Sequence, residues 1–423
     1  MDLIINVIIW IAYVLSLYFS IFLLLIYLDN SRLFKTEESS LIIPHTPLVS
    51  ILVPAYNEEK TITRTMESIQ NIDYPQDKLD VIIINDGSKD KTEQIITEYI
   101  KNKPHFRLLS HANRGKAASM NRALELVKGE FFACLDADSF VHPYTLRKML
   151  SLYYKENDLD LAIITPAMKV DNPKNMLQRV QWLEYIIIIL ISRITSHMDS
   201  LYVAPGPFSL YRTSIIKELK GFDEKNITED QEIAYRVQKH HYKIKQCFDG
   251  YVYTTAPAKI KPFYKQRKRW YLGSILCLNQ YKDMVANRKY GDFGLMQMVK
   301  NVTGYFIAIT GMILVVYLFV LPLRLWIKNM MAINFNLFPY FLHRLHVDTL
   351  TFLLMDLKKA YIVCFLFAIG FFFFYQAHKN AQEKIMKYGW IPLVPYFAWY
   401  YLLKGVILMI SLAEFSRNKK VKW

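Results

Sequence analysis

The chain has 423 residues, 53% of them hydrophobic, and a formal net charge of +15 at pH 7. This length predicts more than one structural unit, and the hydrophobic share exceeds the roughly 45–50% that is usual for soluble domains. A positive net charge of this size is compatible with binding to nucleic acid, to an acidic membrane surface or to a phosphorylated substrate. The sequence has no nucleic-acid-binding motif and its excess charge lies largely near apolar runs, so we expect membrane lipids and no nucleic acid as partners.

The first element in chain order is a run without charged residues between Asp2 and Asp29. It is long enough to cross a bilayer. Because it lacks a basic start and a small-residue cleavage site, we expect residues 1–29 to be a retained membrane anchor. Charged, mixed sequence follows to about Lys300, which predicts a water-soluble domain over residues 30–300.

From Val49 onward, short apolar runs alternate with amphipathic stretches. The apolar runs resemble buried strands: Val49–Val53, Val81–Ile84, Phe106–Leu109 and Phe131–Leu135. The stretches between them have helical spacing: Lys60–Gln70, Thr92–Lys101 and Lys116–Val127. This alternation predicts an α/β domain, in which helices cover a parallel sheet and ligands bind at the carboxyl ends of the strands.

Polar clusters follow the first, second and fourth predicted strands. They are Pro54-Ala55-Tyr56-Asn57-Glu58, Asn85-Asp86-Gly87-Ser88 and Asp136-Ala137-Asp138. Tyr56 can stack on a nucleobase, and Asp86 can accept hydrogen bonds from a base or a ribose. Ordinary turns also favour Asn, Asp and Gly, but three such clusters at successive strand ends favour a binding site.

The third cluster suggests a metal site. Asp136 and Asp138 are two residues apart, a spacing that turns both carboxylates to one side of an extended chain. Their hard oxygen ligands suit Mg²⁺ or Mn²⁺ bridging to a diphosphate. Nearby, Asn113-Arg114-Gly115-Lys116 opens a helix, so its backbone donors and the Lys116 ammonium could bind a phosphate.

Further along, Gln178–Met198 holds the apolar core Tyr185–Ile191 between Glu184 and Arg193. This core is too short to span a bilayer, so we expect a helix near residues 176–198 at the membrane surface, with a buried core helix as the alternative. Residues 271–300 are interpreted as a second interfacial helix.

Thr228-Glu229-Asp230 precedes a helical run. Asp230 would therefore place negative charge in the first turn of a helix, which is its simplest role. A carboxylate in this position could also act as a general base, which accepts the proton of an acceptor hydroxyl.

One stretch combines an amide, two guanidiniums and an indole ahead of an uncharged run: Gln266-Arg267-Lys268-Arg269-Trp270. Arginine forks suit a diphosphate and the indole offers a flat face for a sugar ring. An interfacial anchor is the other explanation for a basic and aromatic run in this position.

The C-terminal region, residues 301–423, is expected to hold about three spans: Val302–Leu323, Ala360–Ala377 and Tyr388–Ala413. The basic loop His378–Lys387 and the soluble domain should both be cytoplasmic. Three spans would then leave the basic tail Arg417–Lys422 outside. Either a piece of Met330–Leu342 also crosses, or the last segment is not a simple span. That segment contains Lys404, which is functional or snorkels to the interface.

The four cysteines, Cys134, Cys247, Cys277 and Cys364, are scattered and have no metal-ligand spacing. We expect reduced, structural thiols, which suit a domain that faces the cytoplasm.

With these motifs in this order, the chain resembles family 2 glycosyltransferases with the GT-A fold. It is most similar to the membrane-embedded processive synthases of cellulose, chitin, hyaluronan and poly-N-acetylglucosamine, over roughly Pro47 to Gly273 and the flanking spans. Three family motifs are matched: the metal-holding acidic pair by Asp136-Ala137-Asp138, the Thr-Glu-Asp motif by Thr228-Glu229-Asp230, and the Gln-x-x-Arg-Trp motif by Gln266, Arg269 and Trp270. Many relatives have two adjacent Asp in the nucleotide motif, whereas here Asn85 precedes Asp86.

The resemblance implies inverting transfer from a UDP-sugar, with N-acetylglucosamine as the expected sugar, to a growing β-linked polysaccharide. It implies a multi-pass cell-membrane enzyme with a cytoplasmic catalytic domain, Mg²⁺ or Mn²⁺ as cofactor, and polymer export through its own helices. A single-sugar transferase with a lipid or lipid-phosphate acceptor and a non-catalytic membrane subunit or transporter are the alternatives. The sequence does not specify the linkage or the oligomeric state.

The resemblance also implies roles for single residues. Asp230 would be the catalytic base, and Asp136 and Asp138 the metal ligands. Donor-binding residues would be Ala55, Tyr56, Glu58, Asp86, Lys116, Asp136 and Arg269. Acceptor-binding residues would be Gly206, Phe208, Glu229, Gln266 and Trp270, the first two within a loop at Pro205–Arg212. Lys268 is expected to tolerate substitution.

Overall fold

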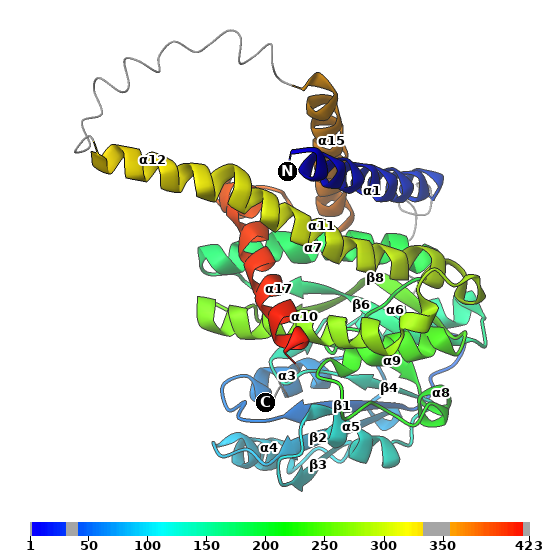
Figure 1. Ribbon diagram of the computed structural model, residues 1–423. Helices are drawn as coiled ribbons and strands as arrows, with labels where there is room; N and C mark the ends of the chain where they lie inside the picture. Colours follow the sequence, from blue (N-terminus) through cyan, green and yellow to red (C-terminus); the bar gives the residue numbers. More distant parts are fainter. Residues whose placement is uncertain (1, 31–40, 333–355, 418–423) are drawn as a thin grey trace.

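A mixed β-sheet is the centre of the protein, whose computed structural model describes residues 2–30, 41–332 and 356–417. The strands are β1 (Val49–Ala55), β2 (Leu79–Asp86), β3 (Phe106–His111), β4 (Phe131–Cys134), β5 (Ser139–Val141), β6 (Leu161–Val170), β7 (Ser209–Arg212) and β8 (Lys243–Thr254). They form one eight-stranded sheet in the order β3-β2-β1-β4-β7-β6-β8-β5 (Figure 1).

The parallel half of this sheet confirms the predicted strands. β1 pairs in parallel with β2 and β4, and β2 pairs in parallel with β3. Helices α3 (Ile62–Gln70), α4 (Thr92–Ile100) and α5 (Lys116–Glu125) connect these strands, as the alternating pattern predicts. Side chains alternate across β1: Ile51 packs with Met66 of α3 on one face, and Leu52 packs with Met120 of α5 on the other.

The other half of the sheet is mixed and was not predicted. β7 pairs antiparallel with β4 and β6, β6 pairs in parallel with β8, and β5 pairs antiparallel with β8. β8 carries Lys243, Lys245 and Gln246, so it lacks the continuous apolar run of a buried strand. The prediction of a loop over Pro205–Arg212 is wrong for its second half, because Ser209–Arg212 forms β7.

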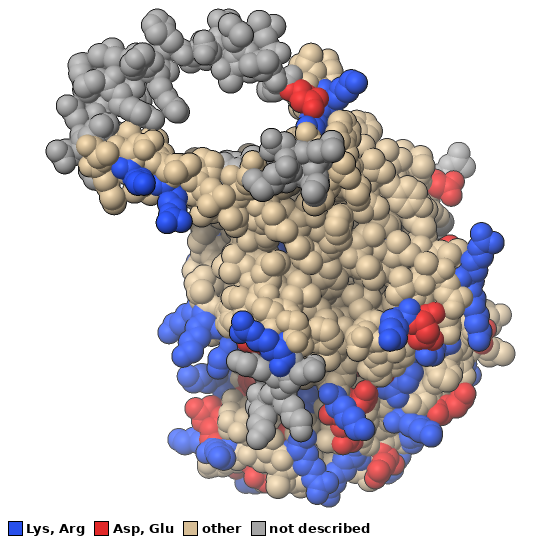
Figure 2. Space-filling view, viewed as in Figure 1, with Lys and Arg blue, Asp and Glu red and all other residues tan. Residues whose placement is uncertain are grey.

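Long apolar helices form a layer beside the sheet domain (Figure 1). They include α1 (Asp2–Asp29), α11 (Val299–Val315), α15 (Leu357–Asn380) and α17 (Tyr401–Ser416), while the shorter α12 (Leu321–Ala332), which carries Arg324 and Lys328, follows α11. Within the described residues, four segments are long and apolar enough to cross a membrane: Asn6–Asp29, Phe293–Val315, Leu357–Asn380 and Leu393–Ser416. Figure 2 shows few charged side chains over this layer and many over the sheet domain. The proposed extra crossing within Met330–Leu342 lies outside the described residues from position 333 onward.

Two helices lie between the sheet and this apolar layer. α7 (Met176–His197) contacts β6 and β8 on one side and α1 and α15 on the other, and α10 (Ile260–Gln280) packs against α17. The helix predicted near residues 176–198 is thus confirmed as a helix, while its position at a membrane surface stays a prediction. A capping box starts it, in which Asn175 accepts from the Gln178 backbone N–H at 3.0 Å.

The prediction of one helix over residues 271–300 is wrong. α10 ends at Gln280, and short turns at Lys282–Met284 and Arg288–Tyr290 precede a new helical segment at Phe293. Gly291, at φ +53°, adopts a left-handed conformation that breaks helical continuity. Cys134, Cys247 and Cys277 are buried and Cys364 is exposed, and within the described residues no disulfide joins these four side chains.

Candidate active site

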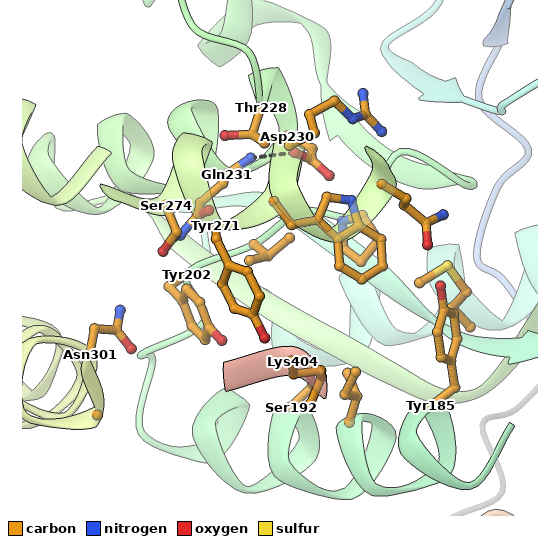
Figure 3. Close-up of a pocket in the computed structure, with 18 of the residues that line it drawn as sticks. Tyr185, Ser192, Tyr202, Thr228, Asp230, Gln231, Tyr271, Ser274, Asn301 and Lys404 are labelled. Atoms are coloured by element: carbon orange, nitrogen blue, oxygen red, sulfur yellow. Dashed lines mark hydrogen bonds between the residues drawn. The ribbon is translucent and has the colours of Figure 1, made fainter. Parts of the chain in front are cut away.

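A cavity of about 940 Å³ extends from the carboxyl ends of the central strands to the apolar helices. Asp136, Asp138 and Asp230 lie on its sheet side, and Tyr305 and Lys404 lie on its helical side. Figure 3 shows Asp230 and Gln231 at one end, Ser192 and Lys404 at the other, and the Tyr271 ring between them. One continuous space therefore joins the acidic motifs to the helices predicted to span the membrane.

A smaller, more open pocket of about 580 Å³ adjoins the cavity. Asp138, Gln266 and Arg269 line both spaces, and the smaller pocket adds Glu58 and Lys265. Asp138 is thus accessible from two sides, whereas Asp136 lines only the larger cavity.

Lys116 links two of the predicted motifs. It lies in the first turn of α5, and its Nζ is 2.6 Å from Asp136 Oδ1 and 2.9 Å from Glu229 Oε1. Burial lowers the pKa of Lys116, but the Asp136 and Glu229 carboxylates outweigh it and hold the pKa above its usual value. Lys116 therefore remains charged and ties the acidic pair to the Thr-Glu-Asp motif.

The carboxylates around Asp138 have the chemistry of a divalent-cation site. Burial and the Asp136 charge raise the pKa of Asp138 to about 6. The pKa of Glu58 is also raised, mainly by burial and further by the Asp136 and Asp90 carboxylates. A cation would relieve this repulsion. Within residues 2–30, 41–332 and 356–417, no three acidic, His or Cys side chains converge to hold a metal alone. Asp136 and Asp138 would therefore suit an ion that takes its remaining ligands from a bound substrate, as Mg²⁺ usually does.

Asp230 faces the cavity from the first turn of helix α9 (Glu229–Lys239). Its Oδ1 accepts a hydrogen bond from the Gln231 backbone N–H at 2.8 Å (Figure 3). Burial, reinforced by the Glu229 carboxylate, raises the pKa of Asp230 to about 6 although Lys116 and Arg269 lower it. Such a carboxylate is suited to accept a proton near neutral pH.

The two predicted acceptor residues of the Pro205–Arg212 segment have different surroundings. A Cβ on Gly206 would lie 2.8 Å from Lys116 Nζ and 2.9 Å from Asp136 Oδ2, so only glycine allows the backbone this close to the ion pair. Phe208 is fully buried in the core, and its backbone N–H bonds to the Cys134 carbonyl oxygen. The acceptor role of Phe208 is therefore wrong, since its ring has no exposed surface to offer a sugar.

Three of the predicted donor-binding residues, Ala55, Tyr56 and Asp86, line neither pocket. They lie at the ends of β1 and β2. Asp86 accepts from the backbone N–H groups of Arg114 at 2.8 Å and Gly115 at 3.0 Å, so it holds the loop that precedes Lys116. Tyr56 is 44% exposed and free to stack, whereas Ala55 is 1% exposed and can offer only backbone atoms. Their contacts with a nucleotide stay predictions.

The Gln266–Trp270 stretch lies on α10, where Gln266, Arg269 and Trp270 line the cavity. Arg267 points elsewhere: its side chain is 3% exposed and pairs with Glu184. Of the two guanidiniums in this motif, Arg269, the one predicted to bind the donor, lines the cavity, whereas Arg267 is occupied by its pair with Glu184.

Sequence reasoning missed several side chains of the cavity. Figure 3 places Tyr202, Tyr271, Ser274 and Asn301 around it. Helical spacing is a signal for one of them, since Ser274 is four residues after Trp270 and lies on the same helix face. Tyr202 and Asn301 come from distant segments that no motif marks.

The chain is similar to several known proteins. Residues 50–220 match the model of glycosyl transferase family 2. The chain is 25% identical over 375 residues to a poly-beta-1,6-N-acetyl-D-glucosamine synthase of Staphylococcus epidermidis, covering 88% of this chain and 84% of that protein. It is 27% identical over 243 residues to the protein of the same name from Staphylococcus aureus (strain COL), covering 57% and 58%.

One solved structure is similar over its whole length. The mannosyltransferase PcManGT from Pyrobaculum calidifontis, in complex with GDP-Man and Mn²⁺, matches with a TM-score of 0.60 and 15% identity. The match covers 97% of this chain and 100% of that chain, so the two share a fold. The predicted GT-A fold with apolar helices is thereby confirmed. The chain is therefore similar to glycosyl transferase family 2 over residues 50–220, and over 375 residues it is similar to a poly-beta-1,6-N-acetyl-D-glucosamine synthase.

Proposed function

We propose that this chain is a processive, inverting glycosyltransferase that adds N-acetylglucosamine from UDP-N-acetylglucosamine to a growing β-linked polysaccharide. The observation that carries the proposal is the single cavity in which Asp138, Asp230 and Trp270 face apolar helices. The printed names of the staphylococcal relatives support the choice of sugar and polymer.

The donor diphosphate would bind between Asp138 and Arg269, which line both the cavity and the smaller pocket. Asp136 and Asp138 would hold Mg²⁺ or Mn²⁺, which when bound neutralises the diphosphate and stabilises it as a leaving group. Tyr56 and Asp86 would meet the nucleoside. The Mn²⁺ in the similar mannosyltransferase structure supports a divalent ion.

In the transfer step, the acceptor hydroxyl loses its proton to the Asp230 carboxylate while its oxygen attacks the anomeric carbon of the donor. The bond from that carbon to the diphosphate breaks, and UDP leaves with the bonding electrons. Arg269 offsets the developing negative charge. Attack from the face opposite the leaving group inverts the configuration, so no covalent enzyme intermediate is needed.

The acceptor would lie along Trp270 and extend toward Tyr271 and Lys404, with the catalytic domain in the cytoplasm and the helices among membrane lipids. A second candidate is a single-sugar transferase with a lipid-phosphate acceptor. Two cationic side chains on the helical side of the cavity, Lys300 and Lys404, favour it. Product length separates the two candidates, because single transfer gives no ladder on a sizing gel.

The donor is tested by incubating membranes that contain the chain with one labelled UDP-sugar at a time. Polymer is expected from UDP-N-acetylglucosamine, and polymer from UDP-glucose alone would show that the donor assignment is wrong. Omitting divalent cations should abolish the product, with restoration by Mg²⁺ or Mn²⁺.

A further inference from the structure

A buried polar cluster joins three helices beside the cavity. We call Glu184 of α7, Arg267 of α10 and Tyr400 and Lys404 of the last apolar segment the Glu184 cluster. Glu184 Oε2 accepts from Arg267 Nη2 and, at 2.6 Å, from Tyr400 Oη. Glu184 Oε1 accepts from Lys404 Nζ at 2.8 Å, and Arg267 Nη2 also lies 3.2 Å from Tyr400 Oη.

The cluster contains more positive than negative charge, since one carboxylate faces two cations. The side chains of Glu184, Arg267 and Lys404 are only 9%, 3% and 17% exposed. Burial raises the pKa of Glu184, but the Arg267 and Lys404 charges outweigh it and hold the pKa below its usual value. Removing water from such charges is costly, and a buried ion pair is often no more stabilising than an apolar contact. Stability alone therefore does not account for a charged cluster here.

Arg267 connects the cluster to the acceptor side of the cavity. Its guanidinium lies 4.2 Å from the centre of the Trp270 ring, on the same helix face three residues away. Glu184 fixes the guanidinium, and the guanidinium in turn supports one face of the indole. Trp270 lines the cavity together with Lys404 and with Tyr185, the residue after Glu184.

We propose that Glu184 is a positioning residue for the acceptor-binding wall. It fixes the Trp270 indole through Arg267, and it ties that wall to the last apolar helix through Lys404. The inference rests on the proposed function, in which Trp270 binds the acceptor sugar. Glu184 touches neither the metal-binding carboxylates nor Asp230 in this arrangement, so donor binding should not depend on it.

A second ion pair joins the same two helices and provides a matched control. Lys268 Nζ of α10 lies 2.7 Å from Glu414 Oε2 of α17, with side chains 23% and 27% exposed. Pairs of this partly exposed kind contribute about 0–1 kcal/mol. Lys268→Met therefore removes a link between α10 and α17 without touching the Trp270 support.

The test uses the purified full-length protein with UDP-N-acetylglucosamine and an N-acetylglucosamine oligosaccharide as acceptor. It compares the unmodified protein with E184Q, K404M, K404R and the control K268M. For E184Q we expect the acceptor KM to rise about tenfold or more and the product to shorten, while the donor KM stays within about twofold. K404M should shorten the product less, K404R should restore most of its length because it keeps the charge, and K268M should match the unmodified protein.

An E184Q variant with unchanged acceptor KM and product length would overturn the proposal. So would a donor KM that rises as much as the acceptor KM, since that would indicate a general loss of structure. If E184Q does not fold, K404M and K404R decide, and equal product lengths for these two variants would count against the proposal. If the unmodified protein forms no polymer, the proposed function fails as well, which distinguishes that outcome from failure of the positioning role alone.

Discussion

The two charged regions that border the cavity differ in how far their charges are compensated. Around Asp138 and Asp230, carboxylates outnumber nearby cations, and the pKa of both residues is raised to about 6. In the Glu184 cluster, cations outnumber the carboxylate, and both Glu184 oxygens accept hydrogen bonds. In the proposed function, the first region would bind a cation and accept a proton, whereas the second would hold three helices together. Substitutions should therefore affect chemistry in the first region and geometry in the second.

The strongest effect should come from Asp230→Asn. We expect kcat to fall about 10³-fold or more, because the amide cannot accept the proton of the acceptor hydroxyl. UDP binding, measured by calorimetry, should persist. The thermal midpoint should not fall, since a buried carboxylate with a raised pKa destabilises the fold when it is ionised. Full activity in this variant would contradict the mechanism.

The pH dependence of activity is the next largest effect. Activity requires ionised Asp230, so kcat should fall about tenfold per pH unit below pH 6, and more steeply if Asp138 titrates in the same range. Stability should change in the opposite direction. A carboxyl whose folded pKa is raised stabilises the fold when protonated, and this contribution is lost as pH rises through about 6. A kcat that stays constant down to pH 5 would rule out Asp230 as the base.

Gly206→Ala should have a smaller effect, which falls on the donor because Gly206, although predicted to bind the acceptor, adjoins the Lys116–Asp136 pair of the proposed donor site. The new methyl group would press on Lys116 Nζ and Asp136 Oδ2 and disturb their ion pair. We expect the donor KM to rise about tenfold while the protein still folds, because a lysine end can shift. Gly370→Ala is the control, since a Cβ at Gly370 meets no atom within 4 Å. Equal kinetics in the two variants would argue against the close approach.

The smallest effect is expected for Lys268→Met. The Lys268–Glu414 pair is partly exposed, so the free energy of unfolding should drop by about 1 kcal/mol or less. Polymer yield should stay within about twofold. A large loss of yield would show that polymer synthesis depends on the α10–α17 contact outside the Glu184 cluster. It would contradict the assignment of helix positioning to the Glu184 cluster.

The region near Asp138 could be predicted from sequence because its signals are local. Strands β1, β2 and β4 contain short apolar runs, a polar cluster follows each of these runs, and parallel pairing brings the strand ends together. Asp136 and Asp138 come immediately after β4, and Asp230 lies in the first turn of a helix, so their positions follow from the chain near them.

The Glu184 cluster could not be predicted in the same way. Glu184 pairs with residues 83 and 220 positions further along the chain, and only the packing of three helices brings them together. The sequence did mark Glu184 as the boundary of an apolar core and Lys404 as a charge within an apolar run, but it did not indicate that they meet. Phe208 shows the opposite error: its segment suggested a contact with the acceptor, but the residue lies directly before β7 and its ring is buried in the core.

The most direct test of the central proposal is product analysis with the purified protein, labelled UDP-N-acetylglucosamine and a divalent cation. The proposed function predicts a ladder of long polymers on a sizing gel, lost on chelation of the cation and absent for Asp230→Asn. A single labelled sugar on a lipid, or no transfer from this donor at all, would contradict it.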